Sequence, residues 1–248
     1  MCRWRPTSDR ADALIASLHH QPLLVVLRPP SPAAAGARIA SLAAIGVRHI
    51  EIAWQAGSAW IEESAALLEA FPSLLLGAAS LHSLEGLEAA RQAGFSYGVS
   101  PILDQEFCHR AGDDLVLVPG VMTPTEVHQA RGMGCRLVKL FPAVSLGPGY
   151  WRRLAAPLGE PLPFCIAAGG LGAQDVPQWL AAGVDAVALG SALPLLTPPM
   201  AAATSPRTAV LDPAAPAARD PALAELAALL AQLGETPERS CHPVAPKP

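Results

Sequence analysis

The sequence predicts a single (β/α)8 TIM barrel, an eight-stranded parallel sheet enclosed by helices. Between about residue 23 and residue 193, short β-branched or leucine-rich runs alternate with alanine-rich segments of helical period. There are eight such runs, which is the strand count of this barrel. The runs are apolar almost throughout, as is typical of parallel strands covered on both faces.

The eight predicted strands are spaced so that each leaves room for a helix and two short loops. Their starts lie about 19 to 27 residues apart. They are LLVVLR (23–28), HIEIAW (49–54), LLLGAAS (74–80), SYGVS (96–100), LVLVPGV (115–121), RLVKLFPA (136–143), PFCIAAGG (163–170) and AVALGSAL (186–193).

Helix boundaries between the strands support the same alternation. In TPTE, Thr123 is placed to cap a helix, Pro124 suits the first helical position, and Glu126 completes a capping box. Other helical segments end in AIG, QAG, GMG or AAG. Each of these endings offers a glycine for a left-handed cap, namely Gly46, Gly94, Gly134 and Gly183.

The two ends of the chain differ from the barrel in composition and in sequence pattern. Residues 1–22 are expected to form an N-terminal helix that caps the barrel, which spans 23–234. Residues 194–248 hold 11 of the 26 prolines, and 194–219 is expected to be a Pro/Ala-rich insertion. A last helix is predicted from Asp220-Pro221 to Gly234, followed by a disordered tail at 235–248.

Composition excludes several classes of protein. Apolar residues make up 51% of the 248 residues and the net charge is −4, which excludes global disorder and favours neither nucleic acid nor membrane as a partner. The five cysteines are an odd number without a C-x-x-C pair. The N-terminus lacks the apolar core of a signal peptide, and prolines interrupt the uncharged stretch 186–206. We therefore expect a cytoplasmic protein.

Lys139 is the first candidate for chemistry. It lies inside the apolar strand LVKLFP, where an ammonium ion is costly to bury. If its side chain points into the barrel, its pKa falls and the neutral amine becomes a nucleophile for a ketone. A lysine that points outward, or that forms a structural pair with a buried carboxylate, is the alternative.

Glu51 is the second candidate, in the strand HIEIAW. Strand alternation places Ile50 and Ile52 against the helices, so Glu51 is expected to point inward, toward Lys139. A carboxylate and a lysine in one apolar cavity suit amine activation and proton transfer. A purely structural ion pair is the alternative.

Glycine-bearing strand ends suggest an anion site. Gly169-Gly170 and Gly190-Ser191 follow the last two strands, where barrels of this type often bind phosphate through backbone N–H groups. The seven histidines form no ligand pattern, so no metal site is expected.

Several longer motifs are more specific than single residues. PGVMTPTE (119–126) and LVKLFPA (137–143) are the most specific, and they stand with GVRHIEI (46–52), LLGAASL (75–81), VSP (99–101), GPGYWRRLAAPL (147–158), AAGG (167–170) and LGSAL (189–193). From about residue 12 to residue 193, and in its terminal helix, the chain resembles the bacterial 2-keto-3-deoxy-6-phosphogluconate (KDPG)/4-hydroxy-2-oxoglutarate aldolases.

The resemblance implies a trimeric class I aldolase with neither metal nor organic cofactor. Such enzymes cleave a 2-keto-4-hydroxy acid to pyruvate and an aldehyde. By position, the Schiff-base lysine falls on Lys139 and the general acid/base on Glu51. The substrate contacts that the resemblance implies are Ser80, in place of a threonine, and Pro101, Phe141, Gly169, Gly170, Gly190 and Ser191.

The chain departs from this family at two positions. Gln55 stands where many members have an arginine for the pyruvyl carboxylate, and glutamine cannot form a bidentate charged pair. Arg28, at the end of the first strand, is the residue that we expect to supply this charge. Ala168 stands where a threonine is common, which removes a hydroxyl near the aldehyde end of the substrate.

The function predicted from the sequence is therefore cleavage of KDPG, a small phosphorylated keto acid, to pyruvate and glyceraldehyde 3-phosphate by a homotrimer. The same chemistry on 4-hydroxy-2-oxoglutarate or on the galactonate epimer is the alternative within this class. A barrel isomerase without an imine, and a non-catalytic barrel that binds a sugar phosphate, are the alternatives of other classes.

Overall fold

The computed structural model confirms the parallel barrel, and it describes residues 9–57, 59–112, 114–190 and 220–234. Its strands are β1 (Leu23–Leu27), β2 (His49–Ala53), β3 (Leu75–Ala79), β4 (Tyr97–Val99), β5 (Val116–Val118), β6 (Gly120–Val121), β7 (Leu137–Leu140), β8 (Phe164–Ala168) and β9 (Ala186–Leu189). They form one sheet in the order β5-β4-β3-β2-β1-β9-β8-β7-β6, with every pairing parallel.

The structure corrects the single strand predicted at 115–121. This segment forms two short strands, β5 and β6, separated by Pro119. Proline has no N–H to donate to a ladder. β5 pairs with β4 on one side, whereas β6 pairs with β7 on the other. The carbonyl of Pro119 accepts a hydrogen bond of 2.8 Å from the N–H of Lys139. The chain thus closes the barrel where it passes from β5 to β6.

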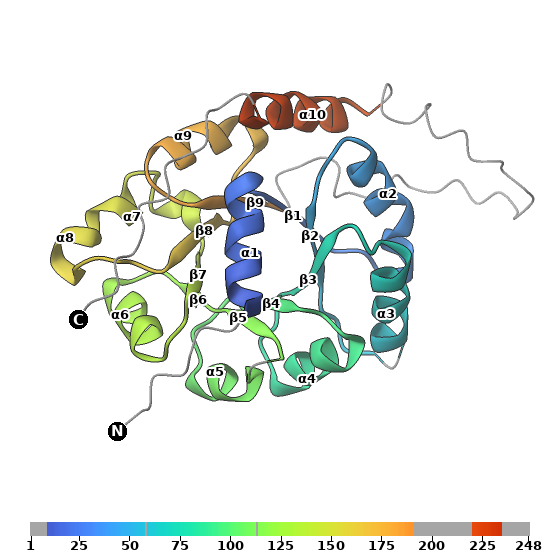
Figure 1. The fold of residues 1–248 in the computed structure, drawn as a ribbon, viewed down its shortest axis with the longest axis horizontal. Helices are drawn as coiled ribbons and strands as arrows, with labels where there is room; N and C mark the ends of the chain where they lie inside the picture. The colour runs from blue at the N-terminus through green and yellow to red at the C-terminus, as the bar shows by residue number, and fades with distance from the viewer. Residues whose placement is uncertain (1–8, 58, 113, 191–219, 235–248) are drawn as a thin grey trace, which may run out of the picture.

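Helices form a ring outside the strands (Figure 1). They are α2 (Gly36–Ala44), α3 (Trp60–Ala70), α4 (Leu84–Ala93), α5 (Gln105–Ala111), α6 (Pro124–Gly132), α7 (Tyr150–Arg153), α8 (Ala155–Leu158), α9 (Val176–Ala181) and α10 (Pro221–Gly234), with 3-10 turns η1 (Pro32–Ala35), η2 (Ala143–Ser145) and η3 (Ala173–Asp175). The capping box of Thr123 and Glu126 is formed as predicted. The four predicted capping glycines all have positive φ.

Strand alternation divides the apolar residues into two layers. One set lies between the strands and the outer helices and includes Ile50 and Ile52. The other set fills the barrel interior and comprises Leu24, Tyr97, Val99, Val118, Leu137, Phe164, Ile166, Ala168, Ala186 and Ala188, with Ala11, Leu14 and Leu18. The interior is a packed core, as in other barrels of this kind.

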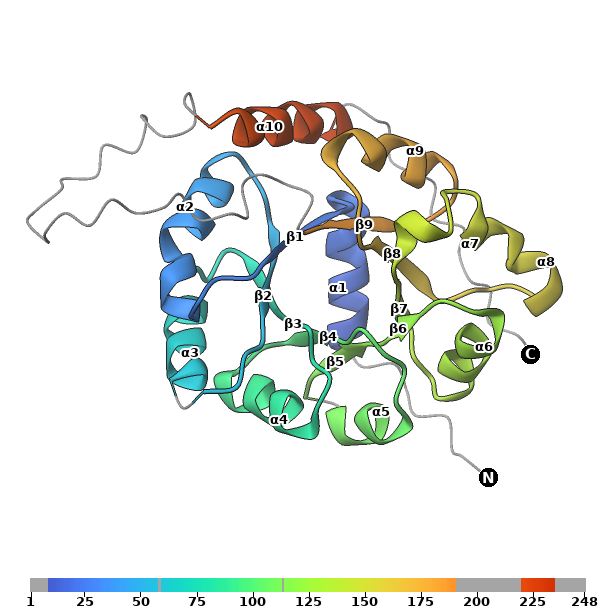
Figure 2. The ribbon, with the colours of Figure 1, turned by 180° about the vertical axis from the view of Figure 1, so that it is seen from behind.

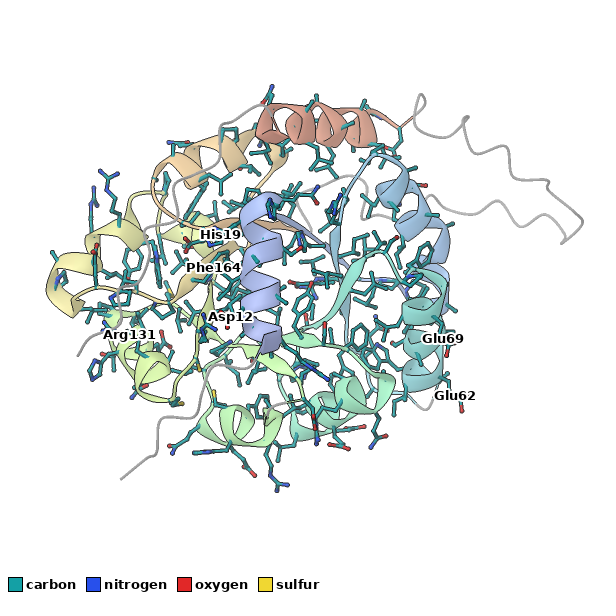
Figure 3. The ribbon with its side chains drawn as sticks, viewed as in Figure 1. Asp12, His19, Glu62, Glu69, Arg131 and Phe164 are labelled. Carbon is teal, nitrogen blue, oxygen red and sulfur yellow. The ribbon has the colours of Figure 1, made fainter. Side chains whose placement is uncertain are left out.

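Helix α1 (Asp9–His20) closes the N-terminal end of the barrel. Its Leu14 and Leu18 are buried with the interior residues, and it crosses the middle of the ring in Figure 1. His19 stands edge-on to Phe164, the first residue of β8, with ring centroids 5.3 Å apart (Figure 3). Polar groups for a substrate must therefore gather at the opposite, C-terminal ends of the strands, which face the viewer in Figure 2.

Two predicted segments, the insertion at 194–219 and the tail at 235–248, lie outside the described residues, as does Ser191. Within the part of the chain that the structure describes, no helix combines the length and the apolar character that a membrane span requires.

Candidate active site

The candidate active site is built around Lys139 in the middle of β7. Its neighbours Val138 and Leu140 point outward into the helix layer and are fully buried, so Lys139 points into the barrel. Its register partners are Gly120 on β6 and Ile166 on β8. The predicted inward orientation of Lys139 is therefore what the structure shows.

Burial changes the acid–base behaviour of this lysine. Loss of hydration lowers the pKa of the Lys139 ammonium to about 8; the Glu51 carboxylate opposes that shift and Arg28 adds to it. The Nζ atom lies 4.5 Å from the centre of the Phe141 ring. At pH 7 about a tenth of the Lys139 side chains are then neutral amines, the form that acts as a nucleophile.

Glu51 is buried in the interior on β2, with only 3% of its surface exposed. Burial raises the pKa of its carboxyl group to about 7, although Lys139 and Arg28 both act in the opposite direction. The two pKa values of the pair lie close together and close to neutrality. Proton exchange between Glu51, Lys139 and a bound substrate is therefore nearly balanced in free energy.

Arg28 and Ser80 form a second polar group at the C-terminal ends of β1 and β3. The Arg28 guanidinium donates a hydrogen bond of 2.8 Å to the Ser80 hydroxyl. Ser80 has φ of 61°, an uncommon value for a residue with a side chain, and strain of this kind is concentrated at functional sites. The pair offers a cation and a hydroxyl side by side to a carboxylate.

Gln55 takes a different part in this region. Its Nε2 donates a hydrogen bond of 2.6 Å to the carbonyl of Pro29, the residue that follows Arg28. Its amide therefore fixes the backbone beside the guanidinium. This contact between two loops was not visible in the sequence.

The glycine pair after β8 approaches two side chains of the β7 end closely. Gly169 and Gly170 have φ of 96° and 79°. A Cβ on Gly169 would stand 2.9 Å from the Phe141 ring, and one on Gly170 would stand 2.5 Å from Val144. These positions need glycine for backbone conformation and for space, and such backbone can present N–H groups to an anion.

The remaining predicted residues lie around this site. Pro101 follows β4 and packs so closely on Gly120 that a Cβ there would be 2.4 Å from the Pro101 carbonyl group. Gly190 follows β9 and is half-buried beside Val26. Ala168 is buried on the inner face of β8, level with Ala188 on β9. The wall between the glycine pair and β9 is therefore apolar.

Two interior residues were not among the sequence-predicted site residues. His49 lies in the interior at the closed end of the barrel, where its two ring nitrogens are 2.8 Å from the Ser17 hydroxyl and 3.1 Å from the Leu23 carbonyl. Burial lowers the pKa of His49 to about 4, so it is neutral at physiological pH. Tyr97 on β4 is buried on the same interior side, which the alternation of SYGVS could have indicated.

A metal centre was not expected, and within the described ranges no three His, Cys, Asp or Glu residues are grouped so that they could hold a metal ion. Glu51 and Lys139 act on each other's ionisation in the interior, and Arg28 at its open end acts on both.

Comparisons with known proteins agree with this geometry. A family model described as KDPG and KHG aldolase matches residues 14–197. The chain is 30% identical to the 2-dehydro-3-deoxy-6-phosphogalactonate aldolase of Escherichia coli (strain K12), over 69% of this chain and 84% of that protein. It is 35% identical to the 2-dehydro-3-deoxy-phosphogluconate aldolase of Pseudomonas aeruginosa, over 46% of this chain and 52% of that protein. A solved structure of native KDPGal aligns with a TM-score of 0.67 at 26% identity, over 86% of this chain and 93% of that one.

Proposed function

Since the chain belongs to the KDPG and KHG aldolase family, we propose that it is a class I aldolase that forms a Schiff base on Lys139. The proposed reaction splits a phosphorylated 2-keto-3-deoxy sugar acid into pyruvate and glyceraldehyde 3-phosphate. The observation that supports it most directly is the buried pair of Lys139 and Glu51, whose pKa values are about 8 and about 7.

Imine formation is the first half of the proposed reaction. The neutral amine of Lys139 attacks the C2 carbonyl carbon of the substrate and gives a carbinolamine. Glu51, protonated in a large fraction of molecules because its pKa is about 7, donates a proton to the C2 hydroxyl, which leaves as water. The product is a protonated imine that can accept an electron pair from the neighbouring carbon–carbon bond.

Carbon–carbon cleavage is the second half. The Glu51 carboxylate accepts the proton of the C4 hydroxyl, the C3–C4 bond breaks, and its electron pair moves into the imine to give an enamine. The C4 fragment leaves as the aldehyde. Protonation of the enamine at C3 and addition of water at C2 then release pyruvate and restore the Lys139 amine.

Three groups of residues are proposed to hold the substrate. Arg28 and Ser80 would bind the carboxylate beside C2, since the guanidinium and the hydroxyl already lie 2.8 Å apart. The backbone of Gly169 and Gly170, with Ser191, would bind the phosphate at the other end of the substrate. Phe141 would cover the amine that lies 4.5 Å from its ring.

The substrate is proposed to be KDPG, and the galactonate epimer is a second candidate. Similarity to the galactonate aldolase of Escherichia coli supports the epimer, as does the apolar Ala168, which offers no hydroxyl to the aldehyde half. Assays with both epimers and with 4-hydroxy-2-oxoglutarate, in which released pyruvate is measured, rank the three by kcat/KM. The homotrimer stays a prediction, which sedimentation velocity tests.

Trapping with borohydride tests the Schiff base. The chain contains only two lysines, Lys139 and Lys247, so the adduct is easily assigned. We expect incubation with pyruvate and borohydride to add about one reduced pyruvyl group per chain by intact mass. The matched variants are Lys139→Arg, which should give no adduct, and Lys247→Arg, which should give the wild-type adduct.

The same experiment separates the aldolase from the other classes. A folded wild-type chain that gives no adduct would contradict the aldolase and favour an isomerase or a sugar-phosphate sensor. An adduct that persists in Lys139→Arg and disappears in Lys247→Arg would contradict the assignment of the nucleophile.

A further inference from the structure

The hydroxyl of Tyr97 is a buried polar group that the proposed mechanism does not use. The residue lies on β4 with 1% of its surface exposed, and its side chain points into the barrel interior. Its hydroxyl oxygen has no hydrogen-bond partner among the described residues. Because a buried tyrosine hydroxyl normally finds a partner, this one calls for an explanation from its surroundings.

The position of the ring is set by Gly77 on the neighbouring strand. A Cβ on Gly77 would stand 2.2 Å from Cζ of Tyr97, so the end of the ring lies directly over the glycine. Gly77 is in turn the register partner of Glu51 on β2. The missing side chain at Gly77 thus lets the ring cross β3, and its hydroxyl is directed toward the strand that carries Glu51.

Glu51 is the charged group that acts on this hydroxyl, and the other polar side chains that the structure describes in the interior do not offer it an acceptor. His49, two residues before Glu51 on β2, has its ring nitrogens at hydrogen-bond distance from Ser17 of α1 and from the Leu23 carbonyl. Lys139 on β7 and Arg28 after β1 are the cations that act on Glu51, and both are donors. Burial, and after it the charge of Glu51, raise the pKa of Tyr97, which keeps its hydroxyl protonated and able to donate.

We infer that Tyr97 is a positioning residue for Glu51, to which its hydroxyl donates through one bridging water from the side of β4. A bridge explains why the two groups interact electrostatically but lie beyond direct hydrogen-bond distance. The bond holds one carboxylate oxygen toward β4 and leaves the other for the substrate. This inference rests on the proposed function, because Glu51 must be the acid/base group for its position to matter.

The pH profile of Tyr97→Phe tests the inference. A hydrogen bond to a carboxylate favours its charged form, so loss of the hydroxyl raises the pKa of Glu51 further. A rise of about one unit would lower the charged fraction of Glu51 about tenfold at pH 6 and hardly at all at pH 9. Because the carboxylate is the form that accepts the C4 proton in carbon–carbon cleavage, kcat/KM for that step should fall in the same proportion. We therefore expect the ratio of the variant to the wild type to be lowest at acid pH and to approach one at alkaline pH.

Tyr150→Phe is the matched control, because it removes the other tyrosine hydroxyl of the chain. That hydroxyl donates to the Met122 carbonyl at 2.7 Å, and the charge that acts on it is Glu126. Its pH profile should follow that of the wild type. The melting temperature of Tyr97→Phe should change little, since the ring and its packing are kept and only one water-bridged hydrogen bond is lost.

Borohydride trapping in the same samples keeps the two proposals apart. An adduct in the wild type and in Tyr97→Phe, together with a shifted profile, supports the inference. An adduct in both with coincident pH profiles overturns it and leaves the aldolase intact. Absence of the adduct in the wild type overturns the proposed function, and the inference falls with it.

Discussion

A single guanidinium, that of Arg28, acts on both ionisable groups inside the barrel. It lowers the pKa of the Lys139 ammonium and also that of the Glu51 carboxyl. It stands at the open end of the interior and donates to the hydroxyl of Ser80 at 2.8 Å. A cation in this place both favours a neutral lysine and can receive the carboxylate of a keto acid.

We predict that Arg28→Ala raises KM for the keto acid by about 10- to 100-fold. Charge-assisted hydrogen bonds of this kind are worth about 1.5–3 kcal/mol, and about 1.4 kcal/mol corresponds to a factor of ten. Steady-state kinetics measure the change. Arg38→Ala is the control, because it removes an arginine that pairs with Asp220 at 2.8 Å, outside the candidate site. An unchanged KM in Arg28→Ala would refute the proposed role.

At the scale of single residues, the sequence showed which face of a strand a side chain occupies, but not which distant residues that side chain contacts. Alternation along HIEIAW was enough to direct Glu51 inward, and the apolar run around Lys139 was enough to mark it. Neither pattern could show that Tyr97 crosses Gly77, since that contact depends on the register between β3 and β4. Similarly, the bond from Gln55 to Pro29 depends on how two loops pack.

At the scale of elements, the split of one predicted strand into β5 and β6 has a direct effect on the site. Gly120, the first residue of β6, is the register partner of Lys139. It also lies against the backbone of Pro101, which follows β4. The position of the nucleophile between its neighbouring strands thus depends on a close contact between two backbone segments. The sequence showed the glycine but not this contact.

We predict that Gly120→Ala lowers both stability and kcat. Its Cβ would meet the Pro101 carbonyl group at 2.4 Å, and backbone cannot move aside cheaply. Overpacking of this kind costs about 1–3 kcal/mol, and a displaced β6 would shift Lys139. Gly132→Ala is the matched control, because Gly132 ends α6 and a methyl group added there would meet nothing within 4 Å beyond its own stretch of chain.

Urea unfolding and steady-state kinetics on the two glycine variants measure the contrast. Gly132→Ala should leave kcat unchanged and stabilise the protein by up to about 1 kcal/mol, because alanine favours the helix. Equal stability and equal kcat in Gly120→Ala and the wild type would contradict the prediction. They would show that the backbone at Pro101 can move to make room for the methyl group without displacing Lys139.

For the molecule as a whole, the alternation of strands and helices was sufficient to predict the barrel. Its eight apolar runs became the strand units of a parallel sheet, because runs of this kind must be covered on both faces. The ionisation of the interior was harder to foresee. It depends on what α1 covers, for example on Ser17 reaching His49, and a periodic pattern does not show such a contact between distant segments.

The interior makes the stability of the whole barrel depend on pH in two opposing ways. Glu51 has a folded-state pKa raised from 4.5 to about 7, so the stability it contributes is full below pH 4.5 and is lost as the pH rises toward 7. His49 has a folded-state pKa lowered from 6.5 to about 4, so its contribution is present above pH 6.5 and is lost as the pH falls toward 4. Between pH 4.5 and 6.5 the two slopes have opposite signs and nearly cancel.

We predict that Glu51→Gln removes this cancellation. The free energy of unfolding of the variant, measured against that of the wild type, should rise by about 2 to 3 kcal/mol when the pH is raised from 4.5 to 6.5. Each proton contributes about 1.4 kcal/mol per pH unit. Urea unfolding at the two pH values measures the gain. Glu62→Gln, on the outer side of α3 (Figure 3), is the control and should follow the wild type at both. A constant difference between Glu51→Gln and the wild type would mean that Glu51 has the same pKa in the folded and the unfolded chain, and that its burial does not hold the proton that the proposed acid step requires.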